Sequence, residues 1–339
     1  MTAAQGSVAG LDRSEEKASL ARIQASVKER LEAVTEDMVT AVSNDAPLVA
    51  QIGTHLMTMR GKMFRPTLVL LCSSVEDKSE PHAITLGAAV ELIHLATLVH
   101  DDAVDHSVLR RGMPTLNSLF SHQISVIMGD FLYSTALTKL VTLGDLDALR
   151  ALTRASTEMT VGEMRQLAVQ DALSFDEDDY YALIGSKTAS LISAACEIGS
   201  LAGARNHRSA LSAYGTALGM AFQIADDLID YTEQESTTGK PTGLDLKEHK
   251  VTLPLIAAMG VMGSDDRRKV DQLFANSNPG DAEIREVIQI VADNGGLDYA
   301  RDRGSLFARQ AREALANVPD TVARTALIES ISYVMERHA

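Results

Sequence analysis

The chain has 339 residues, of which 45% are hydrophobic and only 4% aromatic, with no tryptophan. This length can bury a large core of aliphatic side chains in one or two domains. A net charge of −15, without any Lys/Arg-rich stripe, argues against a nucleic-acid partner. Cys72 and Cys196 lack C-x-x-C spacing, which indicates reduced thiols and a cytoplasmic location.

The N-terminal residues 1–13 are rich in Ala, Gly and Ser and lack the basic region and apolar core of a secretory signal. We expect a flexible tail there, followed by a single all-helical domain over residues 14–339. Apolar residues then recur at helical spacing, which predicts a stripe in the core or in a dimer interface: Leu20, Ile23, Val27, Leu31 and Val34. Because no run of eighteen apolar residues occurs, we expect no transmembrane segment.

A basic segment follows at a predicted loop-to-helix junction, Arg60-Gly61-Lys62-Met63-Phe64-Arg65-Pro66. Proline suits the first turn of a helix, where free backbone amides can bind an anion together with Lys62 and Arg65. Taken alone, the same pattern also fits two solvated cations at a helix N-terminus.

An apolar helix predicted over residues 87–100 ends in three aspartates, Asp101, Asp102 and Asp105. Residues four apart lie on one helix face, one turn from each other. Carboxylates this close lose hydration and repel one another unless cations lie between them. Oxygen ligands at this density suit Mg²⁺, which keeps several waters and shares other positions with substrate phosphates.

The adjacent Arg110 and Arg111 follow in a turn-prone loop. Two neighbouring guanidinium groups repel unless an anion or carboxylates lie between them, so they favour a phosphate clamp. Far downstream, a second D-D-x-x-D cluster ends another small, apolar helical run: Asp226, Asp227 and Asp230. One acidic cluster at a helix end can be a solvated cap, but two with the same spacing favour a shared chemical role.

Strand signals are almost absent, and helical periodicity bounded by Gly, Pro, Asn and Asp recurs along the chain. The predicted helical segments are 66–74, 81–100, 115–143, 146–173, 176–204, 208–231, 253–262 and 281–339. The expected fold class is therefore all-α, a large single-domain helical bundle. Ligands in bundles lie between facing helices, so the two aspartate clusters are expected on opposed walls of one central cavity.

With these motifs, the chain from about Leu48 to the C-terminus resembles the trans-isoprenyl (polyprenyl) diphosphate synthases, with a pattern similar to the medium- and long-chain enzymes. The resemblance implies transfer of prenyl groups in isoprenoid and quinone side-chain biosynthesis, about three Mg²⁺ per active site, and a homodimer. It also implies that the six aspartates Asp101, Asp102, Asp105, Asp226, Asp227 and Asp230 bind the metals. Membrane contact is expected to be at most peripheral, for product release.

The same resemblance assigns the basic and polar residues. Isopentenyl diphosphate is expected on Lys62, Arg65, His94 and Arg111. The allylic diphosphate is expected on Arg110, Lys187, Lys240 and Lys250, and the catalytic set is Lys187, Thr188, Gln223 and Lys240. Lys187 lies within an apolar helical segment, where a cation needs a partner. Arg60, Met63 and Met113 depart from the family pattern and bear on the affinity for isopentenyl diphosphate.

The resemblance implies that the helix before Asp101 determines the length of the product. Thr97 and Ala96 lie four and five residues upstream, about 6 to 7.5 Å deeper along the axis. A bulky aromatic there blocks the growing tail in this family, whereas Ala96 and Thr97 leave the passage open, with Ile93 one turn deeper. The expected product is a medium- or long-chain all-trans polyprenyl diphosphate, longer than farnesyl.

The sequence leaves three alternative functions open. One is a geranylgeranyl diphosphate synthase with a C20 product. A terpene cyclase shares the first aspartate motif and the helical fold, but its second metal site mixes Asn, Ser/Thr and Glu. A non-catalytic subunit of a heteromeric synthase commonly loses one aspartate cluster or the arginine pair, and this chain keeps both.

Overall fold

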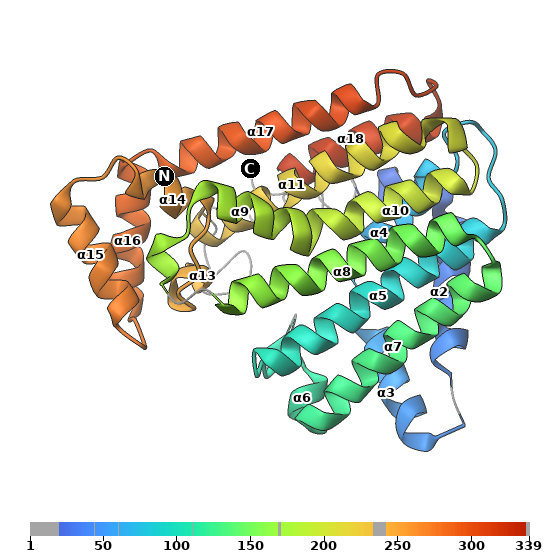
Figure 1. The fold of residues 1–339 in the computed structure, drawn as a ribbon, viewed down its shortest axis with the longest axis horizontal. Coiled ribbons are helices and arrows are strands. Elements are labelled where there is room, and N and C mark those ends of the chain that lie inside the picture. Colours follow the sequence, from blue (N-terminus) through green and yellow to red (C-terminus); the bar gives the residue numbers. More distant parts are fainter. Residues whose placement is uncertain are drawn as a thin grey trace, which may run out of the picture.

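The computed structural model describes residues 20–43, 45–59, 61–110, 112–168, 171–232 and 242–336. The predicted N-terminal tail, Arg60, Arg111 and Lys240 therefore lie outside the described residues. The described part is almost entirely helical, which confirms the all-α prediction, and its helices form an elongated bundle (Figure 1).

The N-terminal half contains η1 (Ala25–Val27), α2 (Lys28–Val42), α3 (Pro47–Thr58), α4 (Phe64–Cys72), α5 (His82–Val104), α6 (Leu116–Leu119), α7 (His122–Leu143) and α8 (Leu146–Ala168). Between α5 and α6 a short antiparallel hairpin pairs β1 (Leu109–Arg110) with β2 (Met113–Pro114). Gly112 at its turn has a φ of +76°, which glycine adopts without steric cost. The hairpin was not predicted from the sequence, and it fixes the direction of Arg110.

The C-terminal half contains η2 (Ala172–Ser174), α9 (Glu177–Ile184), η3 (Gly185–Ala189), α10 (Ser190–Leu201), η4 (Arg205–His207), α11 (Arg208–Thr232), α13 (Leu244–Lys247), α14 (Leu253–Met259), α15 (Ser264–Ala275), α16 (Asp281–Asp293), α17 (Gly296–Ala314) and α18 (Val322–Glu336). Helices α15 and α16 lie together at one end of the bundle, and α17 runs along α11 (Figure 1).

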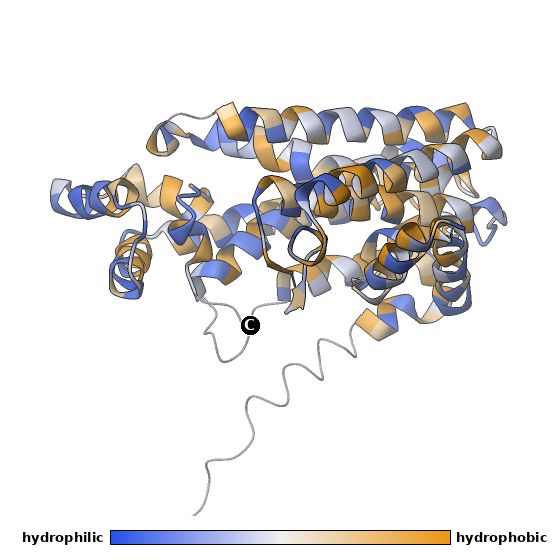
Figure 2. Ribbon diagram, turned by 90° about the horizontal axis from the view of Figure 1, so that it is seen from below, coloured by the Kyte–Doolittle hydropathy of each residue, from blue (hydrophilic) through white to orange (hydrophobic). Residues whose placement is uncertain are grey.

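The main core lies between α2, α4, α5, α7, α8, α10, α11 and α18, where aliphatic side chains dominate. Ile23, Val27 and Val34 are buried there, so the N-terminal apolar stripe belongs to the core. A smaller cluster gathers residues of α13, α14, α15 and α16. Hydrophobic and hydrophilic residues alternate along the helices, as expected for helices that each bury one face (Figure 2).

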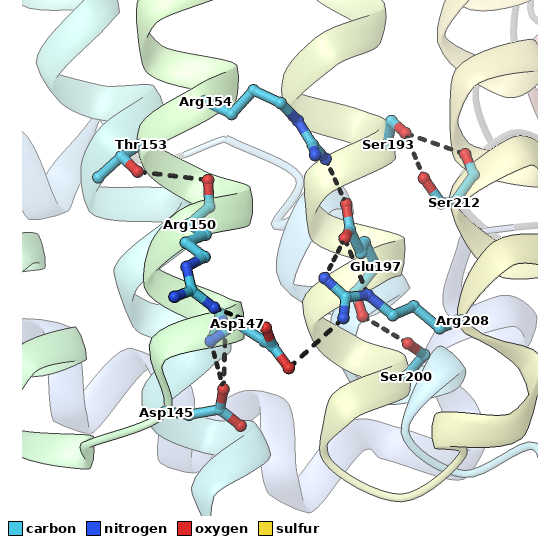
Figure 3. Close-up of polar contacts among 11 residues, drawn as sticks. Asp145, Asp147, Arg150, Thr153, Arg154, Ser193, Glu197, Ser200, Arg208 and Ser212 are labelled. Carbon is cyan, nitrogen blue, oxygen red and sulfur yellow. Dashed lines mark hydrogen bonds and ion pairs between the residues drawn. The ribbon is translucent and has the colours of Figure 1, made fainter.

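Ion pairs connect the helices at the end of the bundle where α10 ends and α11 begins (Figure 3). Buried Glu197 on α10 accepts hydrogen bonds from Arg154 on α8, at 2.6 Å, and from Arg208 on α11, at 2.7 Å. A carboxylate buried with two guanidinium partners is satisfied, whereas one left alone would be costly. This polar cluster therefore fixes three helices relative to one another.

Helices α5 and α7 are long and apolar enough to cross a membrane by length and composition alone. For α5, 67% of the most apolar window is buried inside the bundle, which is typical of a core helix of a globular protein. For α7 the buried share is only 33%, so much of its apolar surface faces outward.

Candidate active site

The first aspartate cluster forms the C-terminal turn of α5, and its three members face different surroundings. Asp101 is half-buried and Asp105 is exposed, one turn apart on the same face, as predicted. Asp102 is turned inward and buried, and Nε of Arg110 lies 2.8 Å and 3.0 Å from its two carboxylate oxygens. The middle carboxylate of this cluster is therefore already bound by a protein donor.

The second cluster, on α11, repeats this division. Asp226 is exposed, whereas Asp227 is buried and accepts hydrogen bonds from the Tyr180 hydroxyl at 2.6 Å and from Nε2 of Gln223 at 2.8 Å. Burial raises the pKa of Asp227 well above its usual range despite these two hydrogen bonds. Asp230 accepts the backbone N–H groups of Leu244 and Asp245, each at 3.0 Å, so it also anchors α13.

Charged side chains connect the two clusters through Lys250 and Asp245, and we call the region between the clusters the cleft. Burial raises the pKa of Asp101 to about 6; the charge of Lys187 opposes this shift and that of Glu163 adds to it. Burial would lower the pKa of Lys250, but it is raised overall, because Glu248, Asp245 and Asp105 surround the ammonium group with negative charge. Lys250 therefore lies close to the first cluster and to the carboxylates beside the second.

Burial is the largest cause of the raised pKa values of Asp101, Asp227 and Asp245, and the neighbouring lysines only partly offset it at Asp101 and Asp245. In the folded chain Asp101 keeps its proton to about pH 6, whereas an unfolded chain releases it near its ordinary value of 3.8. The folded state thus binds more protons between these values, and rising pH lowers stability there. Buried carboxylates that lower the stability of the folded chain in the absence of a cation are typical of a functional site.

The donor set of the cleft fits a hard divalent cation. The less buried carboxylates of the two clusters are those of Asp101, Asp105, Asp226 and Asp230. Within the described residues, no three His, Cys, Asp or Glu side chains already converge closely enough to hold a metal ion. Mg²⁺ commonly takes one or two carboxylates and completes its shell with water and phosphate oxygens, so this donor set fits a metal shared with a diphosphate.

Lys187 and Thr188 lie in η3, a π-helical turn between α9 and α10. The ammonium group of Lys187 is 2.5 Å from Oε1 of Glu163 and 3.2 Å from Oε1 of Gln166, both on α8. The expectation that this cation needs a partner is thus confirmed. Thr188 donates to Oε1 of Gln223 at 2.8 Å, which links η3 to the buried Asp227.

The expected isopentenyl diphosphate residues come from α4, the loop before it, and α5. Lys62 is exposed, and its ammonium group donates to the Tyr333 hydroxyl at 3.0 Å. Arg65 and His94 are half-buried on neighbouring helices. Met63, one of the departures from the family pattern, is buried in the main core and has a φ of +55°.

Residues expected to govern product length lie on the buried side of α5. Ile93 and Ala96 are almost fully buried, and Thr97 is half-buried with its hydroxyl donating to the backbone oxygen of His94 at 2.8 Å. The role of these three residues in product length stays a prediction.

Two residues of the cleft, Asp245 and Tyr180, were not predicted from the sequence. Asp245, at the start of α13, has its pKa raised to about 7 by burial and by Asp230. The acidic residue after Thr242-Gly243-Leu244, shortly beyond the second cluster, was a signal that could have found it. Tyr180 gave no such signal, because the acidic residues before it indicate only a helix N-terminus, and Asp176 and Asp179 do form a capping box there.

A helical bundle that brings two aspartate clusters and several cations to one cleft defines a class of enzymes acting on diphosphates through metal ions. Residues 46–291 match the model of the polyprenyl synthetase family. The chain is 36% identical over 317 residues to an all-trans-nonaprenyl-diphosphate synthase (geranyl-diphosphate specific) of Rhodobacter capsulatus, covering 93% of this chain and 97% of that protein. The chain belongs to the polyprenyl synthetase family, and it is a prenyltransferase.

Two solved structures are similar over nearly the whole chain. The decaprenyl diphosphate synthase of Rhodobacter capsulatus has a TM-score of 0.89 at 34% identity, covering 94% of this chain and 99% of that one. A polyprenyl synthase of Caulobacter crescentus, complexed with calcium and isoprenyl diphosphate, has a TM-score of 0.88 at 33% identity, covering 94% and 98%. The similarity thus extends to a member of the family that holds a divalent cation.

Proposed function

We propose that this chain joins isopentenyl diphosphate head to tail with an allylic diphosphate, using Mg²⁺, and makes a medium- or long-chain all-trans polyprenyl diphosphate. The observation that supports the proposal is the chain of electrostatic interactions between the two clusters: Asp101 interacts with Lys187, Asp105 with Lys250, and Lys250 with Asp245, which in turn lies beside Asp226 and Asp230. The relatives named above, which make nonaprenyl and decaprenyl diphosphates, support the product range.

The reaction requires that the allylic C–O bond breaks and that the negative charge left on the diphosphate is stabilised where it develops. Mg²⁺ on the outward-facing aspartates would supply most of the positive charge for that step. Lys187 and Lys250 add fixed positive charge at the cleft, and Arg110 adds a third, held by Asp102. The buried middle aspartates orient these surroundings instead of facing the substrate.

Lys62, Arg65 and His94 would hold the diphosphate of isopentenyl diphosphate so that its double bond can attack the allylic carbon. Loss of a proton then completes the new double bond, with the departing diphosphate as the base. The dipoles of Thr188 and Gln223 lie beside the buried Asp227 and would shield the positive carbon, while the apolar wall of α5 keeps water away.

The experiment that tests this function uses the purified chain with Mg²⁺, labelled isopentenyl diphosphate, and geranyl, farnesyl or geranylgeranyl diphosphate as primer. The dephosphorylated products are sized by chromatography. A ladder well beyond twenty carbons is the expected result. Products that stop at fifteen or twenty carbons would retain the reaction and overturn the product range, and a lack of incorporation with every primer would overturn the function.

We also propose that the chain works as a homodimer through the outward face of α7. On this helix Val126, Ile127 and Val141 have 37%, 66% and 64% of their surface exposed. An interface between two copies would cover these exposed apolar side chains. Val104, Val108 and Leu109 extend the exposed apolar surface beyond α5.

The dimer gives a direct prediction. Ile127→Glu is expected to shift the protein from dimer toward monomer in sedimentation velocity, because the charge would have to be buried in an apolar interface. The matched control is Val261→Glu, at a site that is 71% exposed in the turn after α14. A wild-type monomer, or equal behaviour of the two variants, would contradict the proposed interface.

A further inference from the structure

Lys187 and Thr188 are adjacent in sequence, yet they bind partners on two different helices. Both lie in η3, where the N–H of Ser190 donates to the oxygen of Gly185, five residues earlier. A π-helical turn holds one more residue than an α-helical turn, and such turns are frequent at functional sites. The extra residue changes the directions of the side chains, so Lys187 reaches α8 while Thr188 reaches α11.

Glycines border this turn on both sides. Where α11 passes it, a Cβ atom added to Gly219 would lie 2.5 Å from Cα and 2.9 Å from Cβ of Ala189. Carbon atoms in contact prefer separations of about 3.5 to 4.0 Å. Because the obstacle is backbone, no side-chain rotation can remove it. On the α8 side, a Cβ on Gly162 would collide with the Ser186 hydroxyl, which can rotate.

We propose that Gly219 is a positioning residue for the allylic diphosphate site, acting through Thr188 and Gln223. Its lack of a side chain lets α11 approach η3 closely enough for Thr188 to donate to Gln223 at 2.8 Å. That bond occupies the amide oxygen of Gln223, so its NH₂ group points to Asp227, also at 2.8 Å. The inference rests on the proposed function, which places the allylic substrate beside these residues.

A larger residue at position 219 would disturb the contacts of Thr188, Gln223 and Asp227 in turn. If α11 moves away from η3, Thr188 and Gln223 separate, and Gln223 loses the contact that fixes its amide. Asp227 is then left buried with one donor fewer, and the outward-facing Asp226 beside it shifts with the helix. The site for the allylic diphosphate and its metals is disturbed, whereas Lys62 and Arg65 on the α4 side stay in place.

The chain offers a matched control one helical turn earlier on α11. A Cβ on Gly215 would lie 2.7 Å from Cα of Ser193 and 2.9 Å from the oxygen of Ile192, so this contact with α10 is equally tight. There the two helices are joined by the Ser193 hydroxyl, which donates to the oxygen of Ser212 at 2.9 Å (Figure 3). Gly215 thus has the same packing role without a connection to the aspartates.

The experiment compares Gly219→Ala with Gly215→Ala. For each, we would measure the melting temperature, the KM of both substrates, and the binding of a non-reactive allylic thiodiphosphate with Mg²⁺ by calorimetry. Similar losses of melting temperature are expected. Only Gly219→Ala should weaken the analogue and raise the allylic KM, by about tenfold or more, since hydrogen bonds to charged groups contribute more than neutral ones. The KM of isopentenyl diphosphate should stay within about twofold.

A second variant protects the test against a general packing defect. Ala189→Gly added to Gly219→Ala removes the contact with the Ala189 Cβ atom but not the closer one with its backbone Cα atom, so it should restore only a part of the analogue affinity. Equal loss of analogue binding in Gly219→Ala and Gly215→Ala would overturn the inference, as would unchanged binding in Gly219→Ala. If the wild-type chain itself did not bind the analogue with Mg²⁺, the proposed function would fail, a result distinguishable from both.

Discussion

Asp101→Asn is expected to lower kcat by about 10³-fold while the protein keeps its melting temperature, because a metal-bound carboxylate contributes several kcal/mol to charge stabilisation. Asp101 faces the cleft, and its charge is disfavoured by burial until a cation arrives. Asparagine preserves the shape of the side chain and removes that charge. Steady-state kinetics over a range of Mg²⁺ concentrations should show a higher requirement for the metal.

The neighbouring Asp102→Asn is the control that separates metal binding from support of the fold. The Asp102 side chain is only 8% exposed and paired with Arg110, so its loss should lower the melting temperature. The expected cost is about 1 to 2 kcal/mol, below that of a fully buried pair, because Arg110 keeps some contact with water. Equal melting temperatures for the two variants, or an unchanged Mg²⁺ requirement in Asp101→Asn, would contradict the division between outward and inward aspartates.

That division shows what spacing alone can predict. The D-D-x-x-D pattern places the first and last aspartates on one face, and the structure agrees for Asp101 and Asp105. The role of the middle residue depends on a partner that spacing cannot identify. For Asp102 the partner is Arg110, eight residues away on the first strand of the hairpin, and for Asp227 it is Tyr180 on another helix.

The same limit applies to Lys187. An ammonium group within an apolar helical segment predicts a partner, and Glu163 is that partner. The π-helical turn that aims Lys187 at Glu163 could not be predicted, because it depends on how closely α8 and α11 approach. Sequence periodicity indicates which face of a single helix is buried. The direction of Lys187 depends instead on contacts among η3, α8 and α11.

Helix ends were harder to predict than helices. The segment 115–143 was predicted as one helix, but it divides into α6 and α7, because the Ser121 hydroxyl accepts the N–H of Ile124 and starts a new helix. The C-terminal segment from 281 divides into α16, α17 and α18, and Gly295, with a φ of +73°, allows the first break. Apolar periodicity continues across such breaks, since the helices on both sides bury apolar faces.

Ala96→Phe is expected to shorten the main product from a long-chain ladder to about fifteen or twenty carbons, because the proposed function places the growing tail along this face of α5. Ala96 lies five residues before Asp101, about 7.5 Å deeper at the helical rise. It is 2% exposed and is followed by Thr97, whose hydroxyl is turned back onto its own helix. An aromatic ring at 96 would therefore have to displace the side chains packed on this face of α5.

Product chromatography with farnesyl diphosphate as primer measures the effect, and turnover of the first condensation serves as the internal reference. A buried Ala-to-Phe change also costs about 1 to 3 kcal/mol of stability through overpacking. Ala89→Phe is the matched control, since Ala89 is equally buried on α5 but lies two turns deeper than Ala96. It should reduce stability in the same way while allowing a longer product than Ala96→Phe. Products of equal length from the two variants would mean that tail length is limited elsewhere, because the position of an obstacle along α5 would then have no influence on the product.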